Sequence, residues 1–176
     1  GVEIDPVEEG VRVERVVPGS PADRESSRLR EGDVITAVEG TPVTEAPNVY
    51  ALLADRVDRR TRLEVRGPDG AGRQVVIRPT DDLDEELYDE WVRERRRLTE
   101  AYSDGRLGYV HVEAMNWPSF ERFERELQAA GDGKDGLLVD VRFNGGGWTT
   151  DYLLTVLTYP QHAYTVPRGA TPDPVA

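Results

Sequence analysis

Apolar residues recur along the chain with two periods, and the period changes near residue 80. Up to residue 79, valine, isoleucine and leucine alternate with polar residues in short runs, which turn residues such as Pro68-Asp69-Gly70 separate. A period of two is typical of half-buried strands. The runs predict strands at 1–4, 11–17, 34–38, 62–66 and 74–78. Short strands between turns indicate a small, partly open β-barrel.

One short helix is predicted inside this first region. Asn48 is a good residue for capping the start of a helix, because its side chain can accept a hydrogen bond from a backbone N–H of the first turn. The apolar positions that follow are predicted to share one face of the helix: Val49, Leu52, Leu53 and Val57.

Residues 80–103 follow a helical period and predict a linker helix. Its start is capped either by Thr80 or by Asp82 with Glu85. Acidic residues fill its first turns and arginines its last turns, an order that offsets the helix dipole. We interpret the arginine cluster as a solvated, paired face. The predicted buried stripe consists of Leu83, Leu87, Tyr88, Trp91, Leu98 and Tyr102.

The remaining sequence predicts a strand, a helix, a second strand and a second helix. In the strand from Leu107, Tyr109 and His111 lie on one face, with Val110 and Val112 on the other. Ser119 is predicted to cap the next helix, which runs to about Gln128 with Phe120, Phe123 and Leu127 on its core face. An apolar strand at 136–141 and a helix at 152–157 follow. This βαβ order predicts a parallel pair with a right-handed crossover.

The turn after the second strand holds the candidate chemistry. It reads Asn144-Gly145-Gly146-Gly147 and precedes a helix. Glycines permit positive φ and close approach of a ligand, and the N–H groups at a helix start favour negative charge. A phosphate, a carboxylate or a developing oxyanion fits such a loop. A tight turn without chemistry remains an alternative, and the glycine spacing does not match the known phosphate loops.

Composition excludes several classes of function. The net charge is −12, so nonspecific nucleic-acid binding is not expected, because neutralising phosphates needs a basic face. There are no cysteines, which excludes disulfides and thiolate metal sites and fits a cytoplasmic protein. No apolar run approaches the length that spans a membrane. His111 and His162 have no clustered ligand partners, so no metal and no cofactor are expected.

A hydrolase that uses serine needs a nucleophile, a base and N–H donors for the oxyanion. The serines are Ser20, Ser26, Ser27, Ser103 and Ser119, and each is interpreted as a turn or cap residue. His111 lies within a predicted strand and is interpreted as a packing or surface residue. The sequence therefore offers candidate donors but neither a nucleophile nor a base.

The run from Asp140 to Gly147 resembles the Asp-x-Arg-x-Asn-x-Gly-Gly signature of tail-specific serine peptidases. With Gly-Tyr-Val-His-Val at 108–112 and Trp148 after it, the run is most similar to the tricorn-protease branch. The resemblance implies that the loop gives a backbone N–H to the oxyanion hole, from Gly146 first, with Gly145 and Gly147 as alternatives. Asp140, Arg142 and Asn144 would support the loop. It also implies that nucleophile and base lie outside these 176 residues.

The first region resembles the PDZ domains of bacterial and archaeal proteases. Pro18-Gly19-Ser20-Pro21-Ala22, then residues 29–35 and 38–43, look like that family's central run. The resemblance implies that Gly1, Val2, Glu3 and Ile4 form the strand that receives a peptide terminus by strand addition. A spacer with a filled groove remains an alternative to this binding role.

The predicted fold class is α+β or α/β, in three parts. A PDZ-like β-barrel covers 1–79, a linker helix 80–103, and the truncated start of an α/β (βαβ) serine peptidase core 104–176. Because the chain begins at Gly1 and ends in a Pro- and Gly-rich run, we expect it to be a piece of a longer protein. The resemblance implies that the longer protein is a cytoplasmic, homo-oligomeric peptidase that acts on peptides. It also implies that the piece alone is inactive, because the nucleophile and the base lie elsewhere. A noncatalytic peptide-binding module and a phosphate- or nucleotide-binding α/β protein are the alternatives.

Overall fold

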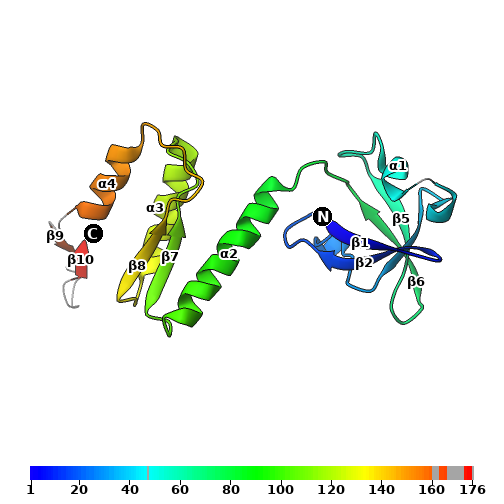
Figure 1. Cartoon of the computed structure of the whole chain (residues 1–176), viewed down its shortest axis with the longest axis horizontal. Helices are drawn as coiled ribbons and strands as arrows, with labels where there is room; N and C mark the ends of the chain where they lie inside the picture. The colour runs from blue at the N-terminus through cyan, green and yellow to red at the C-terminus, as the bar shows by residue number, and fades with distance from the viewer. Residues whose placement is uncertain (47, 160–162, 166–172, 176) are drawn as a thin grey trace. The chain divides into compact units, whose positions relative to one another are not determined.

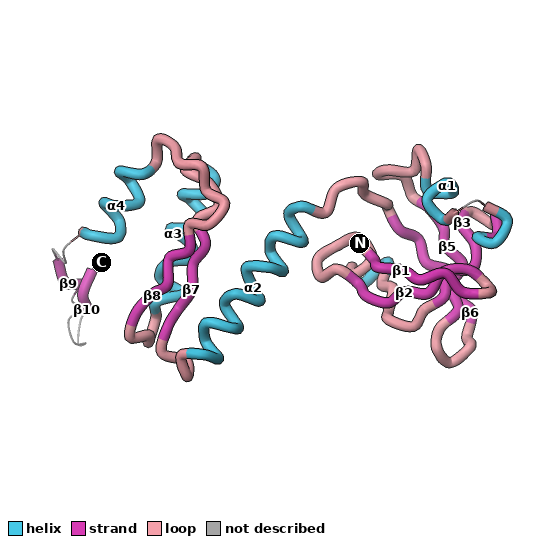
Figure 2. Tube along the Cα trace, in the orientation of Figure 1, coloured by secondary structure: helices cyan, strands magenta, loops and turns pink. Residues whose placement is uncertain are grey.

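The computed structural model describes residues 1–46, 48–159, 163–165 and 173–175. The chain divides into two compact units, residues 1–91 and 92–176, and each is described by itself. Figure 1 labels the helices and strands of both units, and Figure 2 distinguishes them by type. Within the described ranges, no helix has the length and apolar character needed to cross a membrane.

The first unit is built on one antiparallel sheet. Its strands hydrogen-bond in the order β1-β2-β3-β5-β6, and the short β4 pairs with β3. β1 is therefore an outermost strand. The bounds are β1 Val2–Val7, β2 Gly10–Val16, β3 Val34–Val38, β4 Thr41–Pro42, β5 Thr61–Arg66 and β6 Gly72–Ile77.

Short helices complete this unit and cover its core. They are the 3₁₀ turns η1 Glu25–Ser27 and η2 Val43–Glu45, and the helix α1 Val49–Leu53. The side chain of Asn48 caps α1 as predicted, because its Oδ1 accepts the Ala51 N–H at 3.0 Å. Val57 does not share the helix face, since α1 ends at Leu53 and Val57 lies beyond it, exposed. The alternating residues of the strands form the buried cluster, including Val13, Val38 and Leu63.

Helix α2 (Asp84–Tyr102) crosses the boundary between the units. Both predicted capping residues accept backbone N–H groups ahead of the helix: Asp82 Oδ1 accepts the Asp84 N–H at 2.8 Å, and Thr80 Oγ1 accepts the Asp82 N–H at 3.2 Å. The predicted buried stripe is correct only in part. Leu83, Tyr88, Trp91 and Leu98 are partly buried, whereas Leu87 and Tyr102 are exposed, and the fully buried residue of the helix is Val92, which the prediction did not include. The reason near the carboxyl end is that Leu98 and Tyr102 line an open pocket instead of a packed core.

Two arginines of α2, Arg96 and Arg97, form ion pairs in the structure. Arg97 binds Glu94 one turn earlier with Nε–Oε2 at 2.8 Å, and Arg96 pairs with Glu126 of helix α3 (Trp117–Gly131). Exposed pairs of this kind contribute little to stability. For Arg96 and Arg97 the structure thus agrees with the paired face expected from the sequence.

The second unit is a βαβ unit with a further helix. β7 (Leu107–His111) and β8 (Gly136–Asp140) are parallel neighbours, with Tyr109 opposite Leu138 and His111 opposite Asp140. α3 connects them and packs its buried Phe120 and Phe123 against Val110 and Val112. Helix α4 (Thr150–Thr158) follows the glycine loop, and β9 (Ala163–Thr165) pairs with β10 (Asp173–Val175). The parallel pair and the mixed α/β class are confirmed.

The cap of α3 differs from the prediction. Asn116, and not Ser119, caps the helix: Asn116 Oδ1 accepts the Ser119 N–H at 3.0 Å, and Pro118 occupies the first turn. The helix therefore begins at Trp117, three residues earlier than the predicted cap implied, and ends at Gly131. Proline in a first turn has no N–H that needs a partner, which favours this earlier start.

Asn116→Ala is expected to destabilise the second unit by about 1 kcal/mol, the typical cost of losing a side-chain cap. Ser119→Ala is the matched control and is expected to change stability by no more than a few tenths of that, because Ser119 takes part in the cap through its backbone N–H. Amide hydrogen exchange in α3 measures both variants. Equal loss of protection in the two variants would contradict the assignment of the cap.

Candidate active site

The loops that follow β7 and β8 meet because the two strands are parallel and in register. The carboxyl ends of such strands are the usual place for ligands in open α/β sheets. His111 closes β7 directly opposite Asp140, which closes β8. The loop from Val141 to Thr149 then leads to α4, whose first residue is Thr150. Every residue of the Asp140–Gly147 signature lies at this one edge.

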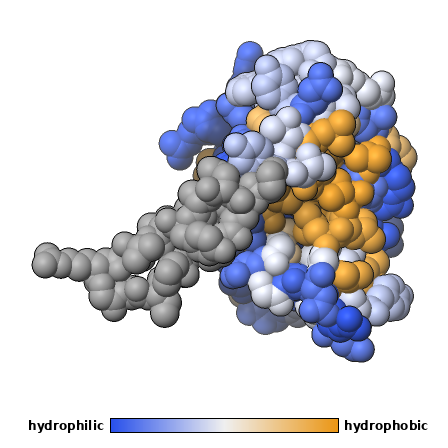
Figure 3. Space-filling view, turned by 90° about the vertical axis from the view of Figure 1, so that its left-hand side faces the viewer, coloured by the Kyte–Doolittle hydropathy of each residue, from blue (hydrophilic) through white to orange (hydrophobic). Residues whose placement is uncertain are grey.

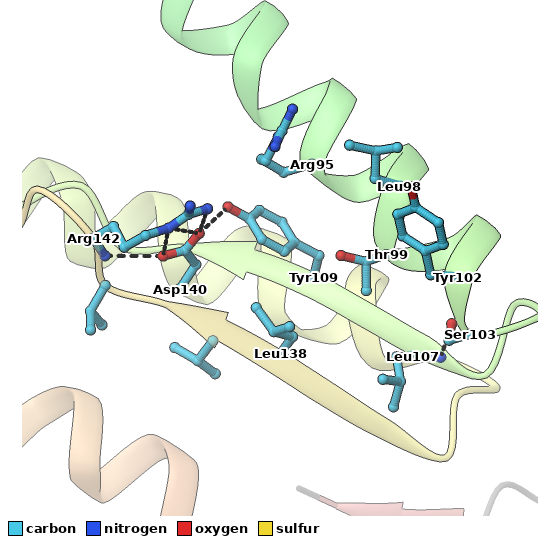
Figure 4. Close-up of a pocket in the computed structure, with 12 residues that line it drawn as sticks. Arg95, Leu98, Thr99, Tyr102, Ser103, Leu107, Tyr109, Leu138, Asp140 and Arg142 are labelled. Atoms are coloured by element: carbon cyan, nitrogen blue, oxygen red, sulfur yellow. Dashed lines mark hydrogen bonds and ion pairs between the residues drawn. The ribbon is translucent and has the colours of Figure 1, made fainter.

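Asp140 is held as a buried carboxylate between two donors. It is 6% exposed, its Oδ2 accepts the Tyr109 hydroxyl at 2.7 Å, and both carboxylate oxygens accept Arg142 Nε at 3.0 Å. Figure 4 shows the three side chains converging at the end of the two strands. The Arg142 hydrogen bonds hold the pKa of Asp140 well below its ordinary value. Asp140 is therefore an anion and not a proton donor near neutral pH.

The same network raises the pKa of Tyr109, first through burial and then through its hydrogen bond to the Asp140 carboxylate. The Tyr109 hydroxyl therefore stays protonated and donates to Asp140. Since neither group changes its charge near neutral pH, the network fixes geometry and does not move protons. Alternation in 107–111 places Tyr109 on a strand face, but it does not reveal this partner across the sheet.

Further hydrogen bonds attach the loop to the end of β7. His111 Nε2 lies 2.9 Å from the Arg142 carbonyl oxygen, which accepts, so this nitrogen carries the proton. The Val112 N–H donates to the Asp140 carbonyl oxygen at 2.8 Å. Asn144 Nδ2 donates to the Val112 carbonyl oxygen at 2.9 Å. His111 is buried, which fits the packing role expected from the sequence.

Gly146 and Gly147 are constrained in different ways, and Gly145 has neither a positive φ nor a close neighbour. Gly146 has φ +84°, and an added Cβ would meet no atom within 4 Å, so its backbone faces open space. Its N–H donates to Asn144 Oδ1 at 2.8 Å, which closes an Asx turn. At Gly147 a Cβ would lie 2.3 Å from the Met115 carbonyl oxygen, where the two residues form an isolated parallel bridge. Gly147 is therefore required by close packing, and Gly146 by its backbone angle.

Four aromatic side chains gather beside the glycine run. Trp148 stacks on Trp117, with the ring centroids 6.0 Å apart and the ring planes 1° from parallel. Tyr152 stands nearly perpendicular to both rings, at 88° and 89°. Phe120 is buried, and its ring centroid lies 5.4 Å from that of Trp117 and 5.9 Å from that of Tyr152. Sequence reasoning named Trp148 only as part of the signature, because the cluster combines the starts of two helices.

A pocket of about 670 Å³ opens between α2 and the β7–β8 pair. Leu98 and Tyr102 of α2, Leu138 of β8 and the Asp140–Arg142 network line it (Figure 4). Apolar side chains also gather on the face shown in Figure 3. Among the exposed large apolar residues of the second unit are Leu138, Val141, Leu154 and Leu157.

The hydroxyls of three of the five serines are hydrogen-bonded to backbone atoms. The hydroxyl of Ser27 donates to the Pro21 carbonyl oxygen at 2.6 Å, that of Ser20 to the Gly1 carbonyl oxygen at 3.2 Å, and that of Ser103 accepts the Leu107 N–H at 3.0 Å. His162 lies outside the described residues. Among the described residues, no group of three His, Asp or Glu side chains is arranged to hold a metal ion.

The other predicted binding residues lie in the first unit. Gly1, Val2, Glu3 and Ile4 form the start of the outermost strand β1 and the residue before it. A pocket of about 420 Å³ runs between β1 and α1, lined by Val2, Ile4, Val49 and Leu53 among others. Gly1, Val2 and Ile4 therefore line a groove beside an outermost strand, and Glu3 of the same strand is not among the lining residues.

Comparison with known proteins identifies both parts of the sequence. Residues 12–67 match the PDZ domain family, and residues 106–173 match peptidase family S41. Tricorn protease homolog 1 from Streptomyces coelicolor is 32% identical over 183 residues, which cover 98% of this chain and 17% of that protein. The tricorn protease of Thermoplasma acidophilum is 32% identical over 143 residues, which cover 81% and 13%.

A solved structure agrees with these sequence matches. The fold is similar to the crystal structure of the tricorn protease, with a TM-score of 0.78 and 26% identity, covering 98% of this chain and 18% of that chain. The chain thus spans less than a fifth of the length of each of these relatives. The resemblance to PDZ domains and tricorn-like peptidases that the motifs indicated is confirmed.

Proposed function

Because this chain is tricorn-like in sequence and fold, with a PDZ segment ahead of a segment of peptidase family S41, we propose that it supplies the oxyanion-stabilising loop of a serine peptidase. The donor is a backbone N–H of the glycine run, with Gly146 first and Gly145 and Gly147 as the alternatives. The nucleophile and the base come from outside these residues. The domains are 1–79, 80–103 and 104–176, as the sequence predicts.

The observation that carries this proposal is the shape of the glycine run. Hydrolysis of a peptide passes through a tetrahedral oxyanion, and N–H donors fixed about 3 Å from that oxygen lower the barrier. At Gly146 the backbone turns outward with φ +84° and meets no side chain or backbone atom where a Cβ would be. A substrate can therefore approach this backbone as closely as such a hydrogen bond requires.

The hydrogen bond between Asn144 and Gly146 affects which glycine N–H can bind the oxyanion. The Gly146 N–H now donates to Asn144 Oδ1, so a substrate oxyanion would compete with that carboxamide for the same proton. A full negative charge is the stronger acceptor, since hydrogen bonds to ionised groups are roughly twice as strong as neutral ones. Asn144 thus holds the loop in shape before the substrate arrives.

Asp140 and Arg142 act as supports in this proposal. Their ion pair, with the Tyr109 hydroxyl, fixes the end of β8 directly before the loop. Asn144 and the Val112 carbonyl oxygen fix the loop from the other side. Errors of 1 Å in such positions cost about 100-fold in rate, so rigid supports are as necessary as the donor itself.

The role of the whole protein follows from the same family resemblance. We propose that the full-length protein hydrolyses peptides, assembles as a homo-oligomer and acts in the cytoplasm. The net charge of −12 argues against nucleic acid as a partner. No cofactor enters this chemistry, since nucleophile, base and N–H donors suffice.

The test is hydrolysis of short fluorogenic peptides by the full-length protein and by residues 1–176. We expect turnover by the full-length protein, abolished by a serine-directed inhibitor, and no turnover by residues 1–176, because these residues hold only the donor loop. Inhibitor-sensitive turnover by residues 1–176 would contradict the split site. Absence of turnover by a folded full-length protein would contradict the peptidase itself.

Peptide binding without catalysis is the second candidate, and the groove beside β1 favours it. An outermost strand next to an apolar groove is the arrangement that accepts a peptide as an added strand. Fluorescent peptides with a free C-terminal carboxylate, titrated into residues 1–176, measure this binding. Leu53→Glu is expected to weaken it, because Leu53 lines the groove, whereas Val76→Glu on β6, outside the groove, is the matched control.

A further inference from the structure

The aromatic cluster beside the glycine run remains largely open to solvent. Trp148 is 64% exposed, Tyr152 50% and Trp117 45%, whereas Phe120 beneath them is 4% exposed. The buried ring of Phe120 thus packs against two of the three partly exposed rings, those of Trp117 and Tyr152. A large aromatic side chain buries about 150 to 250 Å² when it is fully covered. The exposed part of that area on each ring is available to contact a ligand.

The three rings are fixed relative to one another. Trp117 and Trp148 are parallel, and Tyr152 contacts both by its edge, the two arrangements that aromatic rings prefer. They come from the first turn of α3, the glycine loop and the first turn of α4. Because each ring is held by the other two, the surface is formed before any ligand arrives and loses little conformational entropy on binding.

The cluster is continuous with the proposed oxyanion loop. Trp148 follows Gly147 directly, and Gly147 is bridged to Met115, two residues before Trp117. The bridge therefore sets the position of the glycine run and of both tryptophans together. A peptide whose carbonyl oxygen reaches the glycine run would place the side chains next to its scissile bond within reach of these rings.

We propose that Trp117, Trp148 and Tyr152 form a substrate subsite for an aromatic or bulky apolar side chain close to the scissile bond. This inference rests on the proposed peptidase function and names the class of substrate that the same site prefers. The occupant is a peptide side chain, because the rings adjoin the loop that would bind its carbonyl oxygen. Asp151, beside Tyr152 in the first turn of α4, is exposed and disfavours an acidic occupant.

The test uses the full-length protein and a blocked oligo-alanine peptide in which phenylalanine replaces alanine at each position in turn. In the wild type we expect one position next to the cleaved bond where phenylalanine raises kcat/KM about tenfold or more over alanine, the scale of discrimination by an apolar pocket. Trp148→Leu is expected to reduce this preference to about twofold while the all-alanine peptide is still cleaved. Tyr102→Leu, an exposed ring of α2 away from the cluster, is the matched control.

An unchanged phenylalanine preference in Trp148→Leu would overturn the subsite and leave the peptidase proposal standing. The subsite is likewise overturned if Trp148→Leu lowers only thermal stability, because that result indicates that another part of the full-length protein covers the rings. Absence of any hydrolysis by the wild type contradicts the peptidase proposal instead.

In that last case a second readout still decides the subsite. The chain has three tryptophans, and their indole N–H signals in the nuclear magnetic resonance spectrum of residues 1–176 are assigned with single Trp→Phe variants. Adding the phenylalanine peptide is expected to shift the signals of Trp117 and Trp148 but not that of Trp91, and the all-alanine peptide is expected to shift none. Equal shifts of all three signals, or of none, would overturn the inference.

Discussion

Gly147→Ala is expected to lower kcat/KM of the full-length protein by about 100-fold or more, the cost of misplacing a catalytic group by about 1 Å. The added Cβ would lie 2.3 Å from the Met115 carbonyl oxygen and 2.7 Å from its Cβ. Since the first contact is with backbone, a rotamer change cannot relieve it, and the loop must move away from Met115. That movement displaces the Gly146 N–H from the oxyanion position.

Gly131→Ala is the matched control for this substitution. Gly131 ends α3, an added Cβ meets no atom within 4 Å, and its φ is not in the region that favours glycine. Kinetics with a fluorogenic peptide, well below the melting temperature, measure both variants, and circular dichroism confirms that both are folded. A Gly147→Ala protein with wild-type kcat/KM would show that this bridge does not position the catalytic loop.

Asp140→Asn is expected to lower the stability of the β7–β8 pair by about 2 to 3 kcal/mol, the scale of hydrogen bonds to a charged group. The amide cannot pair with Arg142 as a carboxylate does, and its NH₂ group would face the guanidinium donors. The Tyr109 hydroxyl also loses its charged acceptor in a buried place. Amide hydrogen exchange measures the effect locally: protection in β7 and β8 should fall while protection in β5 of the first unit stays unchanged.

The stability that Asp140 contributes is also expected to depend on pH, in a definite direction. The folded-state pKa of Asp140 is depressed, so its contribution to stability is fully present above the ordinary value near 4 and is lost as the pH falls further. The wild type should therefore lose protection in β7 and β8 below about pH 4, and Asp140→Asn should lose less over that interval. Asp135→Asn, which removes an exposed pair with Arg106, is the control and should follow the wild type. Identical acid profiles for Asp140→Asn and the wild type would contradict the structural role of the ion pair.

Much of the fold was predictable because local patterns and tertiary structure agree. Alternation in 107–111 and the apolar run at 136–141 predicted two strands. Because a helix was predicted between them, the two strands were expected to be parallel and joined by a crossover. The position of the glycine loop at the carboxyl edge follows from that topology. Asn48 capped its helix as predicted because a cap depends on residues only three positions apart.

The remaining features depend on contacts between segments that are distant in sequence. Ser119 and Asn116 are both good capping residues. Only the hydrogen bond from the Ser119 N–H to Asn116 Oδ1 in the structure shows that the helix begins at Trp117. The stripe on α2 had the right period, but periodicity does not reveal that Tyr102 faces an open pocket. The Tyr109–Asp140 hydrogen bond joins residues 31 positions apart, and the aromatic cluster combines three segments.

The central claim, that a backbone N–H of the glycine run stabilises an oxyanion, is tested most directly by removing that N–H alone. In the full-length protein, Gly145, Gly146 and Gly147 are replaced one at a time by glycolic acid, which turns the amide N–H into an ester oxygen without adding an atom to the loop. We expect kcat to fall by about 100- to 1,000-fold at the donor position, Gly146 first, with KM little changed. Wild-type kcat in all three ester variants would contradict the account.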